Sequence, residues 1–438
     1  MAVSNGLAQT PPMGWNSYDC FGGEVTEAEV RANADYMAAH LKSHGWEYIV
    51  IDIGWHLRAQ DATFNENGVS RTGRPDAVDQ YGRLLPATDR FPSSAGEKGF
   101  KPLADYIHGL GLKFGIHVMP GIPEPAIQGQ CPVFGSSVTA ADIVYPDKFN
   151  CLSPGFLRHV DYSRPGAQAY ADSLLAQYSE WGVDFIKMDG IGLPYMPDVA
   201  EAMDIARNRC GRRVVLSTSA GYHDYVNLRK HRMAHVEMCR ATEDIWDRWP
   251  QLDMMLHNLP RWQGWSRPGF WVDADMLPLG RIGIRQHPLN SPDRMTTLTR
   301  PEQRLMMSLW CIAQSPLMFG GDLPSNDDWT LSLLTNDEVL AVNQHGRHAR
   351  PIFIDCTQAS FAWISELPGN DSWALGIFST RPNAPHDVKV IFDEADLPPG
   401  LHIRDLWERK DLGRFDRGFT TRMDPHGGRL FKLVRAGA

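Results

Sequence analysis

The sequence predicts a (β/α)8 TIM barrel, residues 1–345, followed by a C-terminal antiparallel β-sandwich domain, residues 346–438. About eight strand–helix units alternate up to His345, which is the pattern of a parallel sheet covered by helices. After Gly346 the helical period disappears, and short strands separated by turns such as Pro368-Gly369-Asn370 follow. An open doubly wound sheet is the alternative for the first part, but no glycine-rich phosphate fingerprint follows any predicted strand.

The barrel elements can be placed in order along the chain. The first helix is clearly marked, because Thr26 and Glu29 form a capping box and Gly45 ends the helical stretch. Expected strands are Met13–Tyr18, Tyr48–Ile53, Lys113–Val118, Asp184–Gly190, Arg213–Thr218, His235–Arg240, Phe270–Met276 and Pro316–Gly320. Further helices are expected at Leu103–Leu110, Ala167–Trp181, Val199–Cys210, Tyr225–His231, Pro301–Ala313 and Trp329–Leu334.

Two irregular stretches interrupt this series, Leu57–Gly99 and Met119–Ser163. The first is rich in Gly, Pro, Asp and Arg and is too long for a simple connection, so we expect it to shape or cover a site. The sandwich strands are expected at Ile352–Ile354, Phe361–Ile364, Trp373–Phe378, Val388–Phe392, His402–Asp405 and Arg429–Val434.

Composition narrows the function classes. The 438 residues carry a net charge of −9, which argues against nucleic acid as a partner. No apolar run approaches a membrane span, and no signal peptide is visible, so a cytoplasmic location is expected unless an export signal has been removed. The seven cysteines form no C-x-x-C pair; Cys131 and Cys151 flank one loop and could pair or remain free thiols. The oligomeric state, including a homo-oligomer, stays open.

The run from Asp184 to Gly190 has the pattern of a buried strand that delivers a carboxylate to the edge of a sheet. Lys187 and Asp189 are two residues apart, so on a strand both point to the same face. A lysine beside a carboxylate favours its ionised form, as a nucleophile requires. The competing interpretation is that Asp189 caps the following helix.

Five acids fall at or just after predicted strand ends, where barrel enzymes hold their chemistry: Asp52, Asp189, Asp244, Asp273 and Asp275. Like charges at one rim require compensation, which Lys187 and Arg240 can supply. A hydrolase with one attacking and one proton-donating carboxyl explains the set economically.

Each acid also has a plainer interpretation. Asp52 could be a cap, and Asp244 could be a solvated loop acid that is confused with Glu243 or Asp247. A lone histidine such as His117 at a strand end is more often a core group than a catalyst. Rival functions are a metal-dependent barrel hydrolase and a non-catalytic sugar-binding protein. The metal hydrolase would use His117, Asp52, Asp189 and Asp275.

Seven motifs occur in order along the chain: Pro11-Pro12-Met13-Gly14-Trp15-Asn16-Ser17, Ile51-Asp52 with Trp55, Lys187-Met188-Asp189-Gly190, Cys239-Arg240 with Asp244, Asp273-Ala274-Asp275-Met276, Ser315-Pro316-Leu317 and Val342-Asn343-Gln344. Together they resemble the motifs of the α-galactosidase-like glycoside hydrolases of family 27. The resemblance covers most of the chain and implies the same barrel-plus-sandwich architecture. It implies a retaining exo-glycosidase that releases a terminal α-D-galactosyl or galactose-like residue from oligo- or polysaccharides.

The resemblance also assigns roles by position. It implies that Asp189 is the nucleophile and Asp244 the acid/base, with no metal and no cofactor. Arg240 resembles the arginine that binds the sugar beside the acid. Trp15 resembles the aromatic wall of the pocket. Sugar-hydroxyl ligands are implied at Lys187, Asp52 and Asp275.

Three departures concern the sugar. The α-galactosidases have a second acid after the second strand, where this chain has Ile53. His117 stands where many members have tyrosine, and Ser219, within Thr218-Ser219-Ala220, replaces a pattern that contacts the 2-position. An apolar residue near the position of C6 of galactose would suit a pentopyranose. The alternative function is therefore a β-L-arabinopyranosidase or another α-glycosidase with altered sugar specificity.

Overall fold

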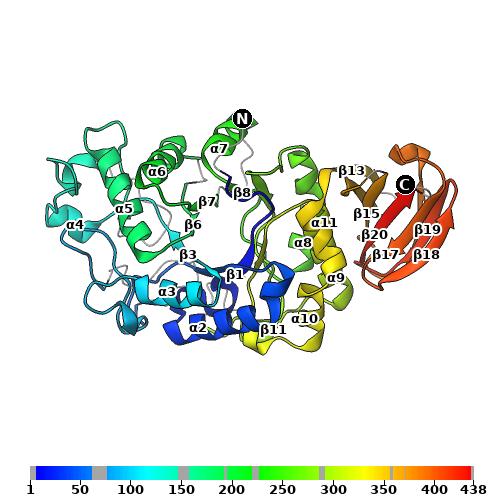
Figure 1. The fold of residues 1–438 in the computed structure, drawn as a ribbon, viewed down its shortest axis with the longest axis horizontal. Coiled ribbons are helices and arrows are strands. Elements are labelled where there is room, and N and C mark those ends of the chain that lie inside the picture. The colour runs from blue at the N-terminus through cyan, green and yellow to red at the C-terminus, as the bar shows by residue number, and fades with distance from the viewer. Residues whose placement is uncertain are drawn as a thin grey trace.

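The computed structural model describes residues 6–61, 76–146, 157–191, 195–219, 226–285, 292–355, 359–369 and 371–435. Figure 1 shows a large α/β part beside a smaller part made of strands, which holds the C-terminal residues. Cys151 lies outside the described residues, so its pairing with Cys131 stays a prediction. Among the described residues, no helix is both long and apolar enough to cross a membrane.

The α/β part is a barrel of parallel strands, as the sequence predicts. Its strands pair in the order β12-β1-β2-β3-β6-β7-β8-β9, and a parallel bridge between Leu277 and Phe319 closes the ring. The strands are β1 (Met13–Asn16), β2 (Tyr48–Ile51), β3 (Lys113–Val118), β6 (Phe185–Met188), β7 (Val215–Thr218), β8 (Met238–Arg240), β9 (Trp271–Asp273) and β12 (Leu317–Phe319).

Alternation along these strands separates the barrel interior from the helical layer. One small cluster of buried side chains fills the interior: Tyr48, Val50, Phe185, Val215, Met238, Met276 and Met318. The residues between them, such as Ile49 and Ile186, belong to the large core shared with the helices. Because successive side chains of a strand point to opposite faces, each strand of this ring is buried on both sides.

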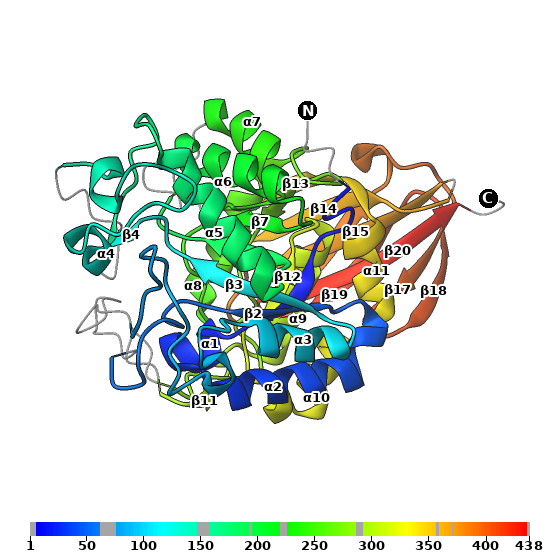
Figure 2. The same cartoon turned by 60° about the vertical axis from the view of Figure 1, so that its left-hand side comes forward.

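Helices surround the ring, as Figure 2 shows. They are α1 (Tyr18–Phe21), α2 (Glu27–Tyr36), α3 (Lys101–Gly109), α5 (Ala167–Trp181), α6 (Pro197–Cys210), α7 (Val226–His235), α8 (Trp249–Asn258), α9 (Arg300–Ile312), α10 (Asp328–Leu334) and α11 (Asp337–His345). The predicted capping box of Thr26 and Glu29 is present, and Gly45 adopts φ 95° where the helical stretch ends. That part of the prediction is confirmed.

Several predicted boundaries are wrong, and two of them have a clear physical cause. His235 was expected to open a strand, but it is the last residue of α7, where its Nδ1 lies 3.0 Å from Oδ2 of Asp204 on α6. This contact holds the helix end against its neighbour. The strand expected at Phe270–Met276 ends at Asp273, because Asp275 has φ 84°, outside the strand conformation.

The long connection after β3 forms a small layer of its own, with β4 (Ile122–Pro123), α4 (Glu124–Gln128) and β5 (Leu157–Arg158). Its core includes Ile122, Val133 and Ile143. The described part of the connection after β2 is tied down by the buried Arg90, which donates to several backbone carbonyls. A hairpin of β10 (Arg281–Ile282) and β11 (Arg294–Met295) follows β9.

The C-terminal part is antiparallel and begins directly after α11. Its larger sheet has the order β13-β14-β15-β20-β17-β18, and β16 pairs with β19. The strands are β13 (Arg347–Asp355), β14 (Ser360–Glu366), β15 (Ser372–Ser379), β16 (His386–Ile391), β17 (Leu401–Asp405), β18 (Lys410–Phe415), β19 (Gly418–Met423) and β20 (Gly428–Arg435). The sheet lies against α9 of the barrel, where a Cβ on Gly428 would meet Leu305 Cα at 2.3 Å.

The sequence analysis missed β18 and β19. Most of β18 is exposed, so its sequence lacks apolar alternation. In β19 the buried side chains include Thr421, and a polar residue at an inward position hides the strand period.

Candidate active site

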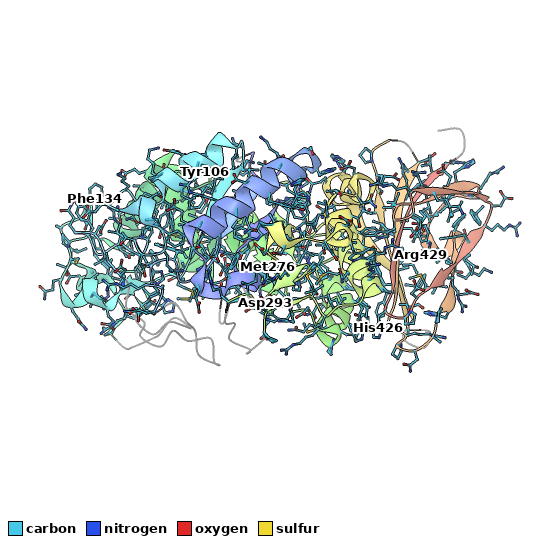
Figure 3. All side chains as sticks on the ribbon, turned by 90° about the horizontal axis from the view of Figure 1, so that it is seen from below. Tyr106, Phe134, Met276, Asp293, His426 and Arg429 are labelled. Carbon is cyan, nitrogen blue, oxygen red and sulfur yellow. The ribbon has the colours of Figure 1, made fainter. Side chains whose placement is uncertain are left out.

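The acids predicted at strand ends gather at the carboxyl end of the barrel strands. Asp52 follows β2, Asp189 follows β6, and Asp273 and Asp275 lie at and just beyond the end of β9. Asp244 lies on the loop after β8. In Figure 3, Met276 marks this part of the barrel, whereas His426 and Arg429 mark the β-domain.

Lys187 joins two of these carboxylates. Its Nζ lies 2.8 Å from Oδ2 of Asp52 and 3.8 Å from Oδ2 of Asp189. His117 Nε2 lies 2.9 Å from the same Asp189 oxygen. Asn16 Nδ2 donates to Oδ2 of Asp52 at 2.7 Å. Lys187 and Asp189 share one face of their strand, as their spacing predicts, and His117 is a contact of the presumed nucleophile rather than only a core histidine.

The charges hold Asp189 ionised. Burial raises the pKa of Asp189, but the Lys187 ammonium and His117 outweigh it, so this pKa lies well below its ordinary value. Burial also raises the pKa of Asp52, but Lys187 and His117 lower it by more, so this pKa lies below its ordinary value. Burial lowers the pKa of Lys187, but its neighbours Asp189 and Asp52 raise it by more. The pKa of Lys187 therefore lies above its ordinary value. An anionic Asp189 is the form that attacks an electrophilic carbon.

Arg240 organises the other side of the site. Its Nη2 lies 2.7 Å from Oδ1 of Asp244, and its Nη1 lies 3.0 Å from Oδ1 of Asp275. The Ile245 N–H donates to the other Asp275 oxygen at 2.6 Å. Burial raises the pKa of Asp275 to about 7, with Asp244 and Asp273 adding to the rise and Arg240 opposing it. The positive φ of Asp275 places strain next to the acids, as is common at functional sites.

The ambiguity among the acids of this loop is resolved by their contacts. Asp244 has a side chain that is 65% exposed and touches Arg240. Asp247 is buried, pairs with Arg294, and accepts from the Thr297 N–H and hydroxyl. Asp247 is therefore a structural acid, whereas the carboxyl group of Asp244 is open to solvent.

The aromatic residue predicted for the pocket wall is misplaced. Trp15 has 0% exposure, packs edge-on against Phe21 and donates to the Gly321 carbonyl. Gly14 and Asn16 face the barrel interior and Asp52, so Trp15 between them must face the helices. A residue with no exposed surface cannot contact substrate.

Tyr18, and not Trp15, is an aromatic residue that lies beside Lys187. Its ring centroid lies 6.0 Å from Nζ of Lys187 and 6.2 Å from the ring of Trp246. Burial raises the pKa of Tyr18, and the charges of Asp244 and Asp52 add to this, so the phenol stays neutral. The alternation of side chains along Met13–Asn16 was the signal that could have excluded Trp15.

The residues predicted to select the sugar lie beside this network. Ile53 is partly exposed and donates its backbone N–H to Oδ1 of Asp52 at 2.8 Å. Ser219 is partly exposed, and its N–H donates to the Met188 carbonyl at 2.9 Å. Ala220 lies outside the described residues. The roles of Ile53 and Ser219 in sugar selection stay predictions.

A metal centre was the rival interpretation of the same residues. Asp52, His117 and Asp189 offer ligand atoms within 4.8 Å of one another. The Lys187 ammonium, however, already supplies a cation between the two carboxylates. The fourth proposed ligand, Asp275, is instead paired with Arg240. This donor set fits a lysine-bridged carboxylate pair better than a bound metal ion.

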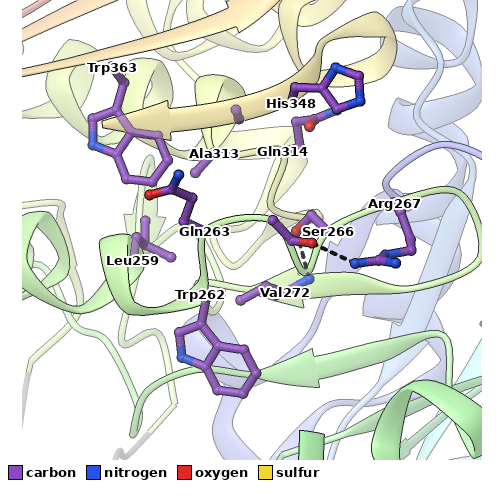
Figure 4. Close-up of a pocket in the computed structure, with 12 residues that line it drawn as sticks. Leu259, Trp262, Gln263, Ser266, Arg267, Val272, Ala313, Gln314, His348 and Trp363 are labelled. Carbon is purple, nitrogen blue, oxygen red and sulfur yellow. Dashed lines mark hydrogen bonds between the residues drawn. The ribbon is translucent and has the colours of Figure 1, made fainter. Parts of the chain in front are cut away.

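A separate cavity lies where the barrel meets the β-domain (Figure 4). Its walls include Trp262, Gln263, Arg267, His348 and Trp363. None of its described lining residues carries a carboxyl group, whereas five acids gather at the strand ends.

Two family models match the chain, in agreement with these two structural parts. One, described as Alpha galactosidase A, matches residues 158–345. The other, described as Alpha galactosidase C-terminal beta sandwich domain, matches residues 358–433. An α-galactosidase from Cyamopsis tetragonoloba is 28% identical over 439 residues, which is 99% of this chain and 88% of the relative.

Solved structures agree. A GH27 β-L-arabinopyranosidase from Geobacillus stearothermophilus is 43% identical, covers 98% of both chains and superposes with a TM-score of 0.93. A variant of that enzyme in complex with arabinose gives the same values. In fold alone, the likeness extends to α-galactosidase I from Mortierella vinacea, with 24% identity and a TM-score of 0.74. The chain belongs to the α-galactosidase-like glycoside hydrolases of family 27, which are retaining glycosidases.

Proposed function

We propose that this enzyme is an exo-acting β-L-arabinopyranosidase that releases a terminal pentopyranose from oligo- or polysaccharides. The observation that carries the choice is Ile53, an apolar residue directly after the sugar-binding acid Asp52. L-arabinopyranose has the ring substituents of galactose but lacks its exocyclic carbon. An apolar side chain at this place removes a partner for a hydroxymethyl group without affecting the ring hydroxyls.

The relative that is 43% identical and is described as a β-L-arabinopyranosidase supports this sugar. The α-galactosidases among the relatives are more distant, at 28% identity for the Cyamopsis tetragonoloba enzyme. α-D-Galactosides are therefore the second candidate substrates, since they share the ring hydroxyls that Asp52 and Lys187 would bind.

The proposed mechanism uses two displacements. An Asp189 carboxylate oxygen forms a bond to the anomeric carbon while the glycosidic C–O bond breaks and Asp244 gives its proton to the leaving oxygen. Asp244 then removes a proton from water, whose oxygen attacks the anomeric carbon and releases Asp189. Two inversions give net retention. Arg240 contacts Asp244 throughout and can stabilise its ionised form after the first step.

A panel of aryl glycosides tests the proposed sugar: β-L-arabinopyranoside, α-D-galactoside, α-N-acetylgalactosaminide and α-D-glucoside. We expect the highest kcat/KM with the arabinopyranoside. Ile53→Asp should favour the galactoside by about tenfold or more relative to wild type, because a new partner for the hydroxymethyl group is worth about one charged hydrogen bond. Activity confined to the α-galactoside in the wild type would overturn the proposal.

A further inference from the structure

Asp19 is a buried acid that the mechanism above does not use. It lies on α1, directly after Tyr18, and has 3% exposure. Its backbone carbonyl accepts a hydrogen bond from the Gly283 N–H at 2.8 Å, which fixes this turn of the chain. Its carboxyl atom Oδ2 is sealed from solvent and has no hydrogen-bond partner among the described residues.

The space for this carboxyl is built into the end of β12. A Cβ on Gly320 would lie 1.9 Å from Oδ2 of Asp19, so any larger residue there would displace the acid. A polar group with no partner is costly to bury, and the fold nevertheless makes room for it. Such a group in a native structure needs an explanation, and a role in the neighbouring site is one.

The surroundings of Asp19 belong to the active site. The charged groups that act on it from the neighbouring elements are Asp275, Lys187, Asp244 and Asp52. Lys187 is the one cation in this set of described neighbours. Burial, followed by the charge of Asp275, raises the pKa of Asp19 well above its ordinary value. Burial and the neighbouring acids therefore favour the neutral form of the Asp19 carboxyl group.

We propose that Asp19 is a further substrate-binding residue, whose neutral carboxyl group donates a hydrogen bond to a hydroxyl group of the sugar bound beside Asp189. Carboxylates such as Asp52 can only accept from sugar hydroxyls, whereas each hydroxyl can both donate and accept. A neutral carboxyl supplies the missing donor without adding a positive charge. The proposal rests on the chain being a glycosidase, but it does not depend on which sugar is preferred.

Two substitutions test this role with the aryl glycoside that the wild type cleaves best, so a different sugar preference would not affect the outcome. Asp19→Ala removes the donor and should lower kcat/KM about tenfold or more, mainly through a higher KM. Asp19→Asn has nearly the same size and keeps an N–H donor, so it should lose clearly less than Asp19→Ala. Asp105→Asn, an exposed acid paired with Lys101, is the matched control.

Mono-deoxy substrates separate substrate contact from a structural role. The loss caused by Asp19→Ala should persist with most of them and disappear with the one that lacks the contacted hydroxyl. An equal loss with every deoxy substrate would overturn the proposal. Should Asp19→Ala fail to fold, difference infrared spectra of the wild type and Asp19→Asn at neutral pH remain decisive. A protonated-carboxyl band of Asp19 that shifts when L-arabinose or galactose binds supports the proposal; absence of that band, or of its shift, contradicts it.

Discussion

Lys187 and Asp189 lie on one face of the same strand, with 3.8 Å between Nζ and Oδ2. The same ammonium lies 2.8 Å from Oδ2 of Asp52. One buried cation thus lowers the pKa of both the proposed nucleophile Asp189 and the proposed sugar-binding acid Asp52. The family resemblance implies these roles, and the distances give their physical basis.

Replacing that cation should affect both pH dependence and stability. In Lys187→Met, the pKa values of Asp189 and Asp52 should rise, so the acidic limb of the kcat/KM profile should move to higher pH. In the wild type these two depressed pKa values contribute stability above the ordinary aspartate value of about 3.9, and this stability is lost as pH falls. The variant should be less stable at neutral pH by about 3–5 kcal/mol, because two carboxylates remain buried without their partner.

Thermal unfolding of wild type and Lys187→Met between acidic and neutral pH measures this difference. We expect the two stability curves to converge towards low pH. An unchanged acidic limb in the variant would contradict the role assigned to Lys187.

Asp244 and Asp247 should respond to substitution in opposite ways. Asp244→Ala removes the proton donor from an exposed position, so hydrolysis of poor leaving groups should fall strongly while the thermal midpoint changes little. Asp247→Asn weakens a buried pair with Arg294, so stability should fall while the chemistry persists. Leaving-group dependence of kcat/KM and thermal unfolding of both variants check this assignment.

Chelation addresses the rival metal mechanism. Because Lys187 bridges Asp52 and Asp189, we expect prolonged chelation to leave the activity unchanged. The measurement is residual activity after dialysis against chelator, followed by addition of zinc or manganese. Loss of activity that either metal restores would favour the metal interpretation.

The sequence predicted the elements whose patterns are local. Three local patterns predicted the structure correctly. They are the capping box of Thr26 and Glu29, the spacing of Lys187 and Asp189, and the alternation of strands with helices. The long-range contacts were not accessible in this way. The contact that marks Asp247 as a structural acid joins segments far apart in the chain, because its partner is Arg294.

The wrong assignment at Trp15 has a different origin. The family resemblance suggested that Trp15 forms a pocket wall. Successive side chains on a strand point to opposite faces, however, and Trp15 lies on the face that packs against the helices. Tyr18 and Asp19 lie on the short α1, where no strand period applies. Their places follow from how the chain leaves β1, which only the folded structure reveals.

Removal of the nucleophile should abolish turnover. In Asp189→Ala the attacking carboxylate is missing, so activity on aryl glycosides should fall to background while the fold persists. External azide or formate can enter the space left by the side chain and should restore part of the activity. Wild-type activity in this variant would show that the assignment is wrong.

The most direct test of the central claim is a covalent label. A 2-deoxy-2-fluoro glycoside of the preferred sugar with a good leaving group should inactivate the enzyme, because the glycosyl–enzyme forms but is hydrolysed slowly. Peptide mass spectrometry should then place one sugar on Asp189. A label on another carboxylate, such as Asp52 or Asp244, or turnover of the aryl glycoside without any covalent intermediate, would contradict this account.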